Sequence, residues 1–178
     1  MSPPPQMSGG RPWVRFLDLV AALVVAAALF RIFVAPRMLH ASSLRLPPLV
    51  LPMVDGSFYH LDRRRGRVVF LDFSTSWCEA CKASLPLAER FARAHPETDV
   101  VTIDSGESAG VTVRFAAQRG LRPHFVAFDS DERLADVFDV SGYPTIVVID
   151  PQGRVNARWY GYNPALESAM EHARTTLR

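Results

Sequence analysis

The sequence predicts an α/β fold with a central mixed β-sheet flanked by helices. Two observations support this prediction. From residue 67 onward, short runs rich in β-branched residues alternate with helical patterns, which is typical of βαβ units with parallel strands. The chain of 178 residues is long enough for one domain with a buried core plus an extension, and short for two domains. We therefore expect a single folded domain.

The N-terminal region has a different composition from the rest of the chain. Residues 1–18 form a tail, and an unbroken apolar run, LVAALVVAAALF, begins at residue 19. Counted through Arg31 to residue 35, this segment has 17 residues, which is near the short limit for crossing a bilayer. We expect residues 19–35 to be an uncleaved transmembrane helix, with a cleaved signal peptide as the main alternative. Arginines flank both sides, so their distribution does not choose the orientation.

A proline-rich stretch, LRLPPLVL, follows at residues 44–51. Its prolines exclude a continuous helix from the membrane segment into the domain. We therefore expect residues 36–50 to be a linker and residues 51–178 to be the folded domain.

Five strands are expected in this domain, each a short apolar run with β-branched or aromatic residues. They lie at residues 67–73, 99–104, 124–128, 145–150 and 155–160. Between the last two, Asp150, Pro151 and Gly153 occupy positions that these residue types favour in a type I turn. The last two strands should therefore form a hairpin.

Helical spacing of apolar residues marks four further segments. They are residues 82–95, residues 109–119 ended by Gly120, a short helix around residues 134–138, and a C-terminal helix. For the last of these, Asn163 is a plausible N-cap and Pro164 fits the first helical position.

The charges are nearly balanced, with 20 basic and 18 acidic residues and a formal net charge of +2. They are spread along the chain and form no basic patch of the kind that nucleic-acid binding requires. We therefore expect no nucleic-acid partner.

The chain has only two cysteines, Cys78 and Cys81, which follow the first expected strand and open the next helix. A helix N-terminus offers unpaired N–H groups and the positive end of the helix dipole, both of which stabilise a thiolate. Cys78 would be the exposed nucleophile. Cys81, one turn later, would resolve the mixed disulfide.

Two other interpretations of the pair are possible. As a staple it would be weak, because two intervening residues close a very short loop. A structural zinc site needs four ligands, and the chain has no second cysteine pair, while its five histidines are scattered singly. Binding of a soft ion such as Cu(I) stays open as an alternative.

Several motifs together resemble the thioredoxin superfamily, and within it the membrane-tethered TlpA/ResA/CcmG-type thiol-disulfide oxidoreductases, over residues 46–178. The matching stretches are G-S-x-x-x-L with a following GRVV at residues 56–69, DFSTSWCEACKASLP at 72–86, GES at 106–108, FDVSGYPT at 138–145 and IDPQG at 149–153. The resemblance implies a thioredoxin fold with an extra strand–helix insertion that begins at residue 124. It also implies a cis peptide between Tyr143 and Pro144, beside the cysteines.

The resemblance and the local chemistry together suggest roles for residues around the pair. Asp72 is expected to accept the proton of the resolving thiol, since its apolar neighbours would desolvate it. Glu107, in the GES stretch, is expected near the active site. Glu79, between the cysteines, is expected to disfavour the Cys78 thiolate and so to favour a reducing couple. Trp77 is expected to contact the substrate. Some cytochrome c maturation reductases have a glutamate three residues after the second cysteine, where this chain has Ser84.

The sequence therefore predicts an enzyme, a protein disulfide reductase anchored by a single pass in the cytoplasmic membrane with its catalytic domain on the periplasmic or extracytoplasmic side. Its expected partners are a client protein with a disulfide, in cytochrome c maturation or a related process, and a membrane electron-donor thiol protein. No organic or metal cofactor is needed. The alternative is a thioredoxin-fold module that binds Cu(I) through the same cysteines and delivers it to a client.

Overall fold

The computed structural model describes residues 13, 18–25, 46 and 48–177. The chain divides into two compact units, Met1–Ser42 and Ser43–Arg178. In the first unit, residues 18–25 are helical. The rest of the expected transmembrane segment at residues 19–35, and most of the expected tail and linker, lie outside the described residues. Across the part that is described, no helix is both long and apolar enough to cross a membrane.

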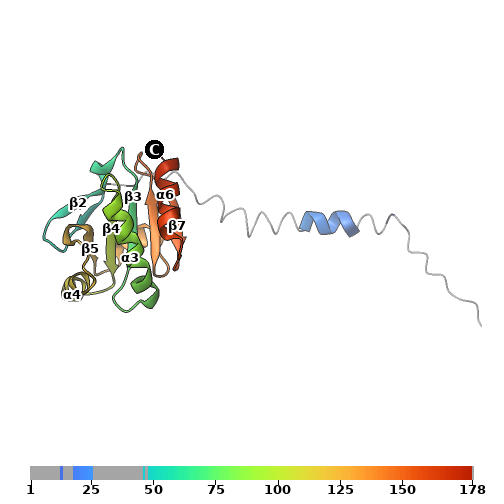
Figure 1. The fold of residues 1–178 in the computed structure, drawn as a ribbon. Coiled ribbons are helices and arrows are strands. Elements are labelled where there is room, and N and C mark those ends of the chain that lie inside the picture. The colour runs from blue at the N-terminus through green and yellow to red at the C-terminus, as the bar shows by residue number, and fades with distance from the viewer. Residues whose placement is uncertain (1–12, 14–17, 26–45, 47, 178) are drawn as a thin grey trace, which may run out of the picture. The chain divides into compact units, whose positions relative to one another are not determined.

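The second unit is built on a five-stranded sheet in the order β5-β4-β3-β6-β7, as Figure 1 shows. Its strands are β3 (Val69–Ser74), β4 (Asp99–Ser105), β5 (Val126–Asp129), β6 (Thr145–Ile149) and β7 (Val155–Tyr160). β3, β4 and β5 run parallel, whereas β6 is antiparallel to both β3 and β7. The predicted mixed sheet is therefore confirmed.

The predicted hairpin joins β6 to β7. The Gly153 N–H donates to the Asp150 carbonyl at 2.8 Å, which closes the turn. The Asp150 carboxylate also accepts from the backbone N–H groups of Gln152 and Arg154, at 3.0 and 2.9 Å. The aspartate at the start of the turn thus stabilises it in the way that asparagine and aspartate commonly do.

Three helices cover one face of the sheet: α3 (Glu79–Ala94), α4 (Ala109–Arg119) and α6 (Leu166–Thr176). In Figure 1, α3 and α6 cross the same side of the strands. The other face is covered by α5 (Arg133–Val137) and by a small hairpin of β1 (Val50–Pro52) and β2 (Phe58–His60), which leads into the 3-10 helix η1 (Leu61–Arg64). A second 3-10 helix, η2 (Pro123–Phe125), precedes β5. β5 and α5 occupy the stretch expected to be the strand–helix insertion.

Side chains along β3 alternate between two hydrophobic cores. Val69, Leu71 and Phe73 belong to the core under β1, β2 and α5, whereas Phe70 belongs to the core under α3 and α6. Because a strand has a period of two residues, Asp72 lies on the same face as Phe70. The central strand therefore buries one carboxyl group on the face that α3 covers.

Two details differ from the sequence-based expectations. The β1–β2 hairpin was not expected, because strands of three residues are too short to show alternation, although Leu51 and Tyr59 are both buried in it. The C-terminal α-helix begins at Leu166 rather than at Pro164. The Asn163 side chain accepts a hydrogen bond from the Ala165 N–H at 2.9 Å, so it caps a turn that precedes the helix.

Candidate active site

Cys78 and Cys81 lie at the N-terminus of α3, immediately after the loop that follows β3. Cys78 is the N-cap residue, and its sulfur accepts a hydrogen bond from the Cys81 N–H at 3.1 Å. The two residues are joined by a disulfide, with their Cα atoms 5.2 Å apart. When this disulfide is reduced, the N–H groups and the dipole of α3 stabilise negative charge on the Cys78 sulfur.

The two cysteines differ in their access to solvent. Cys78 keeps 7% of its surface exposed, whereas Cys81 is completely buried. An external sulfur can therefore reach Cys78 and not Cys81. This asymmetry matches the predicted division between an attacking and a resolving cysteine.

Asp72 is buried in β3, on the face that α3 covers. Its side chain is 1% exposed, and neither carboxylate oxygen has a hydrogen-bond partner in the described part of the chain. Burial raises the pKa of Asp72 to about 7. A carboxyl group with this pKa can both accept and return a proton near neutrality, as the expected role toward Cys81 requires.

The structure brings Glu107 to the loop that carries the cysteines. Its carboxylate accepts hydrogen bonds from the N–H and from the hydroxyl of Ser76, both at 2.6 Å. Burial acts to raise the pKa of Glu107, but the two hydrogen bonds from Ser76, with Asp104, lower it below its usual value. Glu107 therefore holds the residue two positions before Cys78.

The Tyr143–Pro144 peptide is cis, as the resemblance implied. The next residue, Thr145, pairs with Phe73 at the end of β3, so this peptide lies at the same end of the sheet as the cysteine loop. The Trp77 and Tyr143 rings meet edge to face, with centroids 6.1 Å apart. Trp77 is 67% exposed, so its indole presents apolar surface beside Cys78 to an incoming protein.

Two acidic side chains near this site have specific partners. The Tyr143 hydroxyl donates to Glu132 at 3.1 Å, and burial, with Glu132, raises the pKa of Tyr143 to about 12 although Ser105 opposes the rise. Glu79 is largely exposed and forms an ion pair with Lys82 in the first turn of α3. The structure therefore places Glu79 on the outer surface of the helix, paired with a cation.

Two residues of the site were not identified from the sequence. Ser76 is recognised only through its contact with Glu107. Asp104, near the end of β4, is completely buried, and its two carboxylate oxygens make no hydrogen bond of ordinary length and angle among the described groups. The available signal was an acid that ends an apolar strand, DVVTID, which repeats the pattern VVFLD around Asp72.

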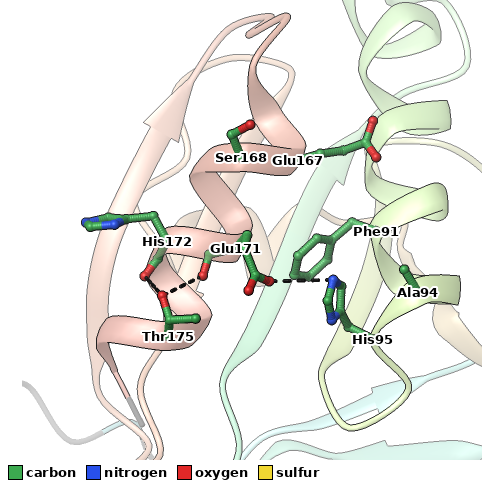
Figure 2. Close-up of a pocket in the computed structure, with 8 residues that line it drawn as sticks. All are labelled: Phe91, Ala94, His95, Glu167, Ser168, Glu171, His172 and Thr175. Atoms are coloured by element: carbon green, nitrogen blue, oxygen red, sulfur yellow. Dashed lines mark hydrogen bonds and ion pairs between the residues drawn. The ribbon is translucent and has the colours of Figure 1, made fainter.

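A separate groove lies between the C-terminal half of α3 and α6, as Figure 2 shows. Within it, His95 Nε2 lies 3.5 Å from the Glu171 carboxylate, and Phe91 forms part of the wall. Residue 95 follows the last residue of α3, so the groove is about 20 Å along the helix from Cys81. This groove does not contribute to the cysteine site.

Comparison with known proteins agrees with this geometry. A family model described as thioredoxin-like matches residues 66–155, which is half of the chain. The chain therefore belongs to the thioredoxin-like family. The predicted superfamily is thus confirmed.

Individual relatives are named as thiol-disulfide oxidoreductases. The thiol-disulfide oxidoreductase ResA of Bacillus subtilis (strain 168) is 32% identical over 111 residues, which are 61% of this chain and 62% of that protein. The matched region thus spans slightly less than two thirds of that relative. That relative is described as a thiol-disulfide oxidoreductase, which is the class predicted for this chain.

Solved structures show the same fold. A protein assigned as a thiol:disulfide interchange protein DsbE from Chlorobium tepidum aligns with a TM-score of 0.68 and 30% identity, over 75% of this chain and 94% of that chain. The exposed lipoprotein thioredoxin Etrx1 from Streptococcus pneumoniae aligns with a TM-score of 0.63 and 28% identity, over 74% and 100% of the two chains.

Proposed function

We propose that this chain is a membrane-anchored, extracytoplasmic protein disulfide reductase that acts through Cys78 and Cys81. The observation that carries the proposal is the asymmetry of the pair. Cys78 is accessible at the N-terminus of α3, and Cys81 is completely buried on the face that also holds Asp72. One sulfur can therefore meet a client while the other meets only the protein interior.

The first step is capture of the client. The Cys78 thiolate attacks one sulfur of the client disulfide, so the client S–S bond breaks and a Cys78–client S–S bond forms. The other client sulfur leaves as a thiolate and takes a proton from solvent. Trp77, exposed beside the attacking sulfur, provides apolar contact area for the client.

The second step is release of the client. The Asp72 carboxylate accepts the proton of the Cys81 thiol, and the Cys81 thiolate attacks the Cys78 sulfur. The mixed disulfide breaks, the Cys78–Cys81 disulfide forms, and the second client sulfur leaves as a thiolate that takes up a proton. Two electrons have then passed from the cysteine pair to the client.

The oxidised pair must be reduced before another cycle. We propose that a dithiol protein of the membrane supplies these two electrons by the same exchange chemistry. Glu79, one residue after Cys78, is exposed and paired with Lys82, so its charge acts only weakly on that sulfur.

The location is proposed from the N-terminal segment and from chemistry. Residues 19–35 form an apolar stretch of sufficient length for a short transmembrane anchor. Disulfides form and persist mainly outside the cytoplasm, so a reductase of protein disulfides finds its clients there. The pneumococcal neighbour is itself described as an exposed lipoprotein. A client in cytochrome c maturation, or in a related process, fits the resemblance to CcmG-type proteins.

Turnover of a protein disulfide tests the proposal. The purified full-length chain should accelerate reduction of insulin by a small dithiol, and Cys78→Ala should abolish the acceleration. Copper bound to the purified chain is measured in parallel. Stoichiometric Cu(I) retention without disulfide turnover would show that the chain is a copper-binding module instead.

A further inference from the structure

A second buried carboxyl group lies near Asp72. In the parallel register of β3 and β4, Ser74 is opposite Asp104 and Asp72 is opposite Thr102. Val101 and Ile103 of β4 belong to the core under β1, β2 and α5, so by alternation Asp104 lies on the α3 face together with Asp72. Asp104 is completely buried, and no hydrogen bond of ordinary length and angle reaches its oxygens within the described chain, although Thr112 and Glu107 act on its carboxyl group.

Two hydroxyl groups at the end of β3 are also buried without a hydrogen bond of ordinary geometry. The Ser74 and Thr75 hydroxyls are buried and have no hydrogen-bond partner in the part of the chain that the structure describes. Buried polar groups without partners destabilise a fold, and native proteins contain few of them. Their concentration directly before the cysteine loop therefore points to a role in the chemistry.

Glu107 connects Asp104 to that loop. The two carboxyl groups interact, since Glu107 raises the pKa of Asp104 and Asp104 lowers that of Glu107. Two carboxyl groups in one poorly solvated site resist being charged together. The two Ser76 donors, at 2.6 Å, stabilise the charge on Glu107. The proton of the pair therefore resides on Asp104.

We propose that Asp104 is a positioning residue for thiol-disulfide exchange. In its neutral form it keeps the single negative charge of the pair on Glu107, and the Glu107 carboxylate holds Ser76 and hence the segment that carries Cys78. This inference rests on the proposed function for the use of Cys78 as the attacking sulfur.

Groups from neighbouring elements surround Asp104. α4 contributes the buried Thr112 and the loop after β4 contributes Glu107, and both act on Asp104. Asp72 of β3 shares the same face of the sheet. Asp129 of β5 lies on the other face, where its carboxylate accepts from Ser105 and from the start of α5. Glu107 is therefore the charged partner that acts on Asp104.

The pKa of Asp104 sets the direction of the pH effect on Cys78. Burial is the main cause that raises the pKa of Asp104 to about 7; the Thr112 hydroxyl opposes the rise and Glu107 adds to it. Asp104 is then largely neutral at pH 6 and largely ionised at pH 8. Above neutrality, the second negative charge beside Glu107 disfavours a thiolate at Cys78 and loosens its loop.

The test compares Asp104→Asn with Asp99→Asn in the reduced full-length protein. Asparagine has nearly the same shape and cannot ionise. Asp99 is an equally buried acid of β4, but it lies at the opposite end of the strand, where Tyr59 and Arg64 hold it. The rate at which iodoacetamide alkylates Cys78 reports the thiolate population, because Cys81 is buried.

At pH 8, Asp104→Asn should be alkylated about threefold to tenfold faster than the unmodified protein, and at pH 6 the two rates should agree. Asp99→Asn should follow the unmodified profile at both pH values. In a Glu107→Gln background, Asp104→Asn should have no further effect. Equal profiles for Asp104→Asn and the unmodified protein, equal acceleration at both pH values, or additive effects with Glu107→Gln would overturn the proposal.

A measurement on the unmodified chain tests the inference even if a variant fails to fold. Carboxyl carbon NMR should show Asp104 titrating near neutrality, with the Ser76 amide proton shifting in parallel. An Asp104 carboxyl that titrates without any response at Ser76 contradicts the inference. Neither measurement needs client turnover, so loss of insulin reduction alone would reject the proposed function and leave this inference standing.

Discussion

The Glu107 carboxylate accepts hydrogen bonds from both the N–H and the hydroxyl of Ser76, at 2.6 Å each. The two residues are 31 positions apart in the chain, and Glu107 lies in the loop that follows β4. The contact therefore ties the loop after one strand to the loop after its neighbour. Because an ionised acceptor strengthens both bonds, this pair fixes the approach to Cys78.

Removing this acceptor should weaken the protein and its reaction together. Glu107→Ala leaves the Ser76 N–H and hydroxyl without their acceptor, so we expect the free energy of unfolding to fall by about 1–3 kcal/mol. The loop should also lose its fixed geometry, which slows client capture. Urea unfolding and the rate of mixed-disulfide formation measure the two effects. Glu79→Gln, at an exposed site, should change stability by less than about 0.5 kcal/mol; an equal loss would contradict the assignment.

Replacing the resolving cysteine should trap clients. In Cys81→Ala the Cys78 thiolate can still attack a disulfide, but no second sulfur displaces the client. Covalent adducts that a reductant cleaves should accumulate on this variant and not on Cys78→Ala. Non-reducing electrophoresis would show them. A Cu(I) site that uses both sulfurs would instead lose its ion to a similar extent with either substitution. Unchanged turnover by Cys81→Ala would rule out the reductase mechanism.

Asp72→Asn should slow release of the client more than its capture. Asparagine cannot accept the proton of Cys81, whereas the attack by Cys78 does not require that transfer. We expect the resolution rate to fall by about tenfold to a hundredfold near neutral pH. Single-turnover measurements that follow the mixed disulfide separate the two steps. A variant that captures slowly and resolves at the normal rate would show that Asp72 acts elsewhere.

Asp72 should also make stability depend on pH. Burial raises its pKa from 3.8 to about 7 in the folded chain, so the folded state holds a proton that the unfolded state has already released. This contribution to stability is fully present below pH 3.8 and is lost as pH rises through about 7, on the order of 4 kcal/mol in total.

Asp72→Asn removes this contribution to the pH dependence, so the variant should be more stable than the unmodified protein at pH 8 and similar to it at pH 4. The part due to Asp104 should persist. Urea unfolding of the oxidised protein across this range gives the comparison, with Asp136→Asn, an exposed site on α5, as the control. Parallel curves for Asp72→Asn and the unmodified protein would be inconsistent with a buried, proton-holding Asp72.

The N-terminal segment should place the domain outside the cytoplasm. Alkaline phosphatase fused after Arg178 is expected to be active, because it folds only where its disulfides can form. A cytoplasmic reporter fused at the same position should be inactive. The reverse pattern would reject the proposed location while leaving the chemistry of the cysteine pair intact. Deleting residues 19–35 should release the protein from the membrane fraction.

The sheet and the identity of the reactive pair could be predicted from the sequence alone. In runs such as VVFLDF and TIVVID, residues at odd and at even positions are mostly apolar, so both faces of each strand must be buried. This predicts a sheet with a layer packed on each face. Cys78 and Cys81 were recognisable because their chemistry depends on local features, namely their spacing and their place at the start of a helix. Motifs of the family then indicated Asp72 and the cis peptide before Pro144.

The contacts among polar residues could be identified only in the folded chain. The pairing of β3 with β4 brings the loops after these strands together, so Ser76 can donate to Glu107. Asp104 lies on the α3 face because alternate residues of β4 point to opposite faces of the sheet. The β1–β2 hairpin likewise buries Leu51 and Tyr59 only because the sheet beneath it exists. Such contacts depend on burial and register between distant segments, whereas local sequence patterns encode only the periodicity of each segment.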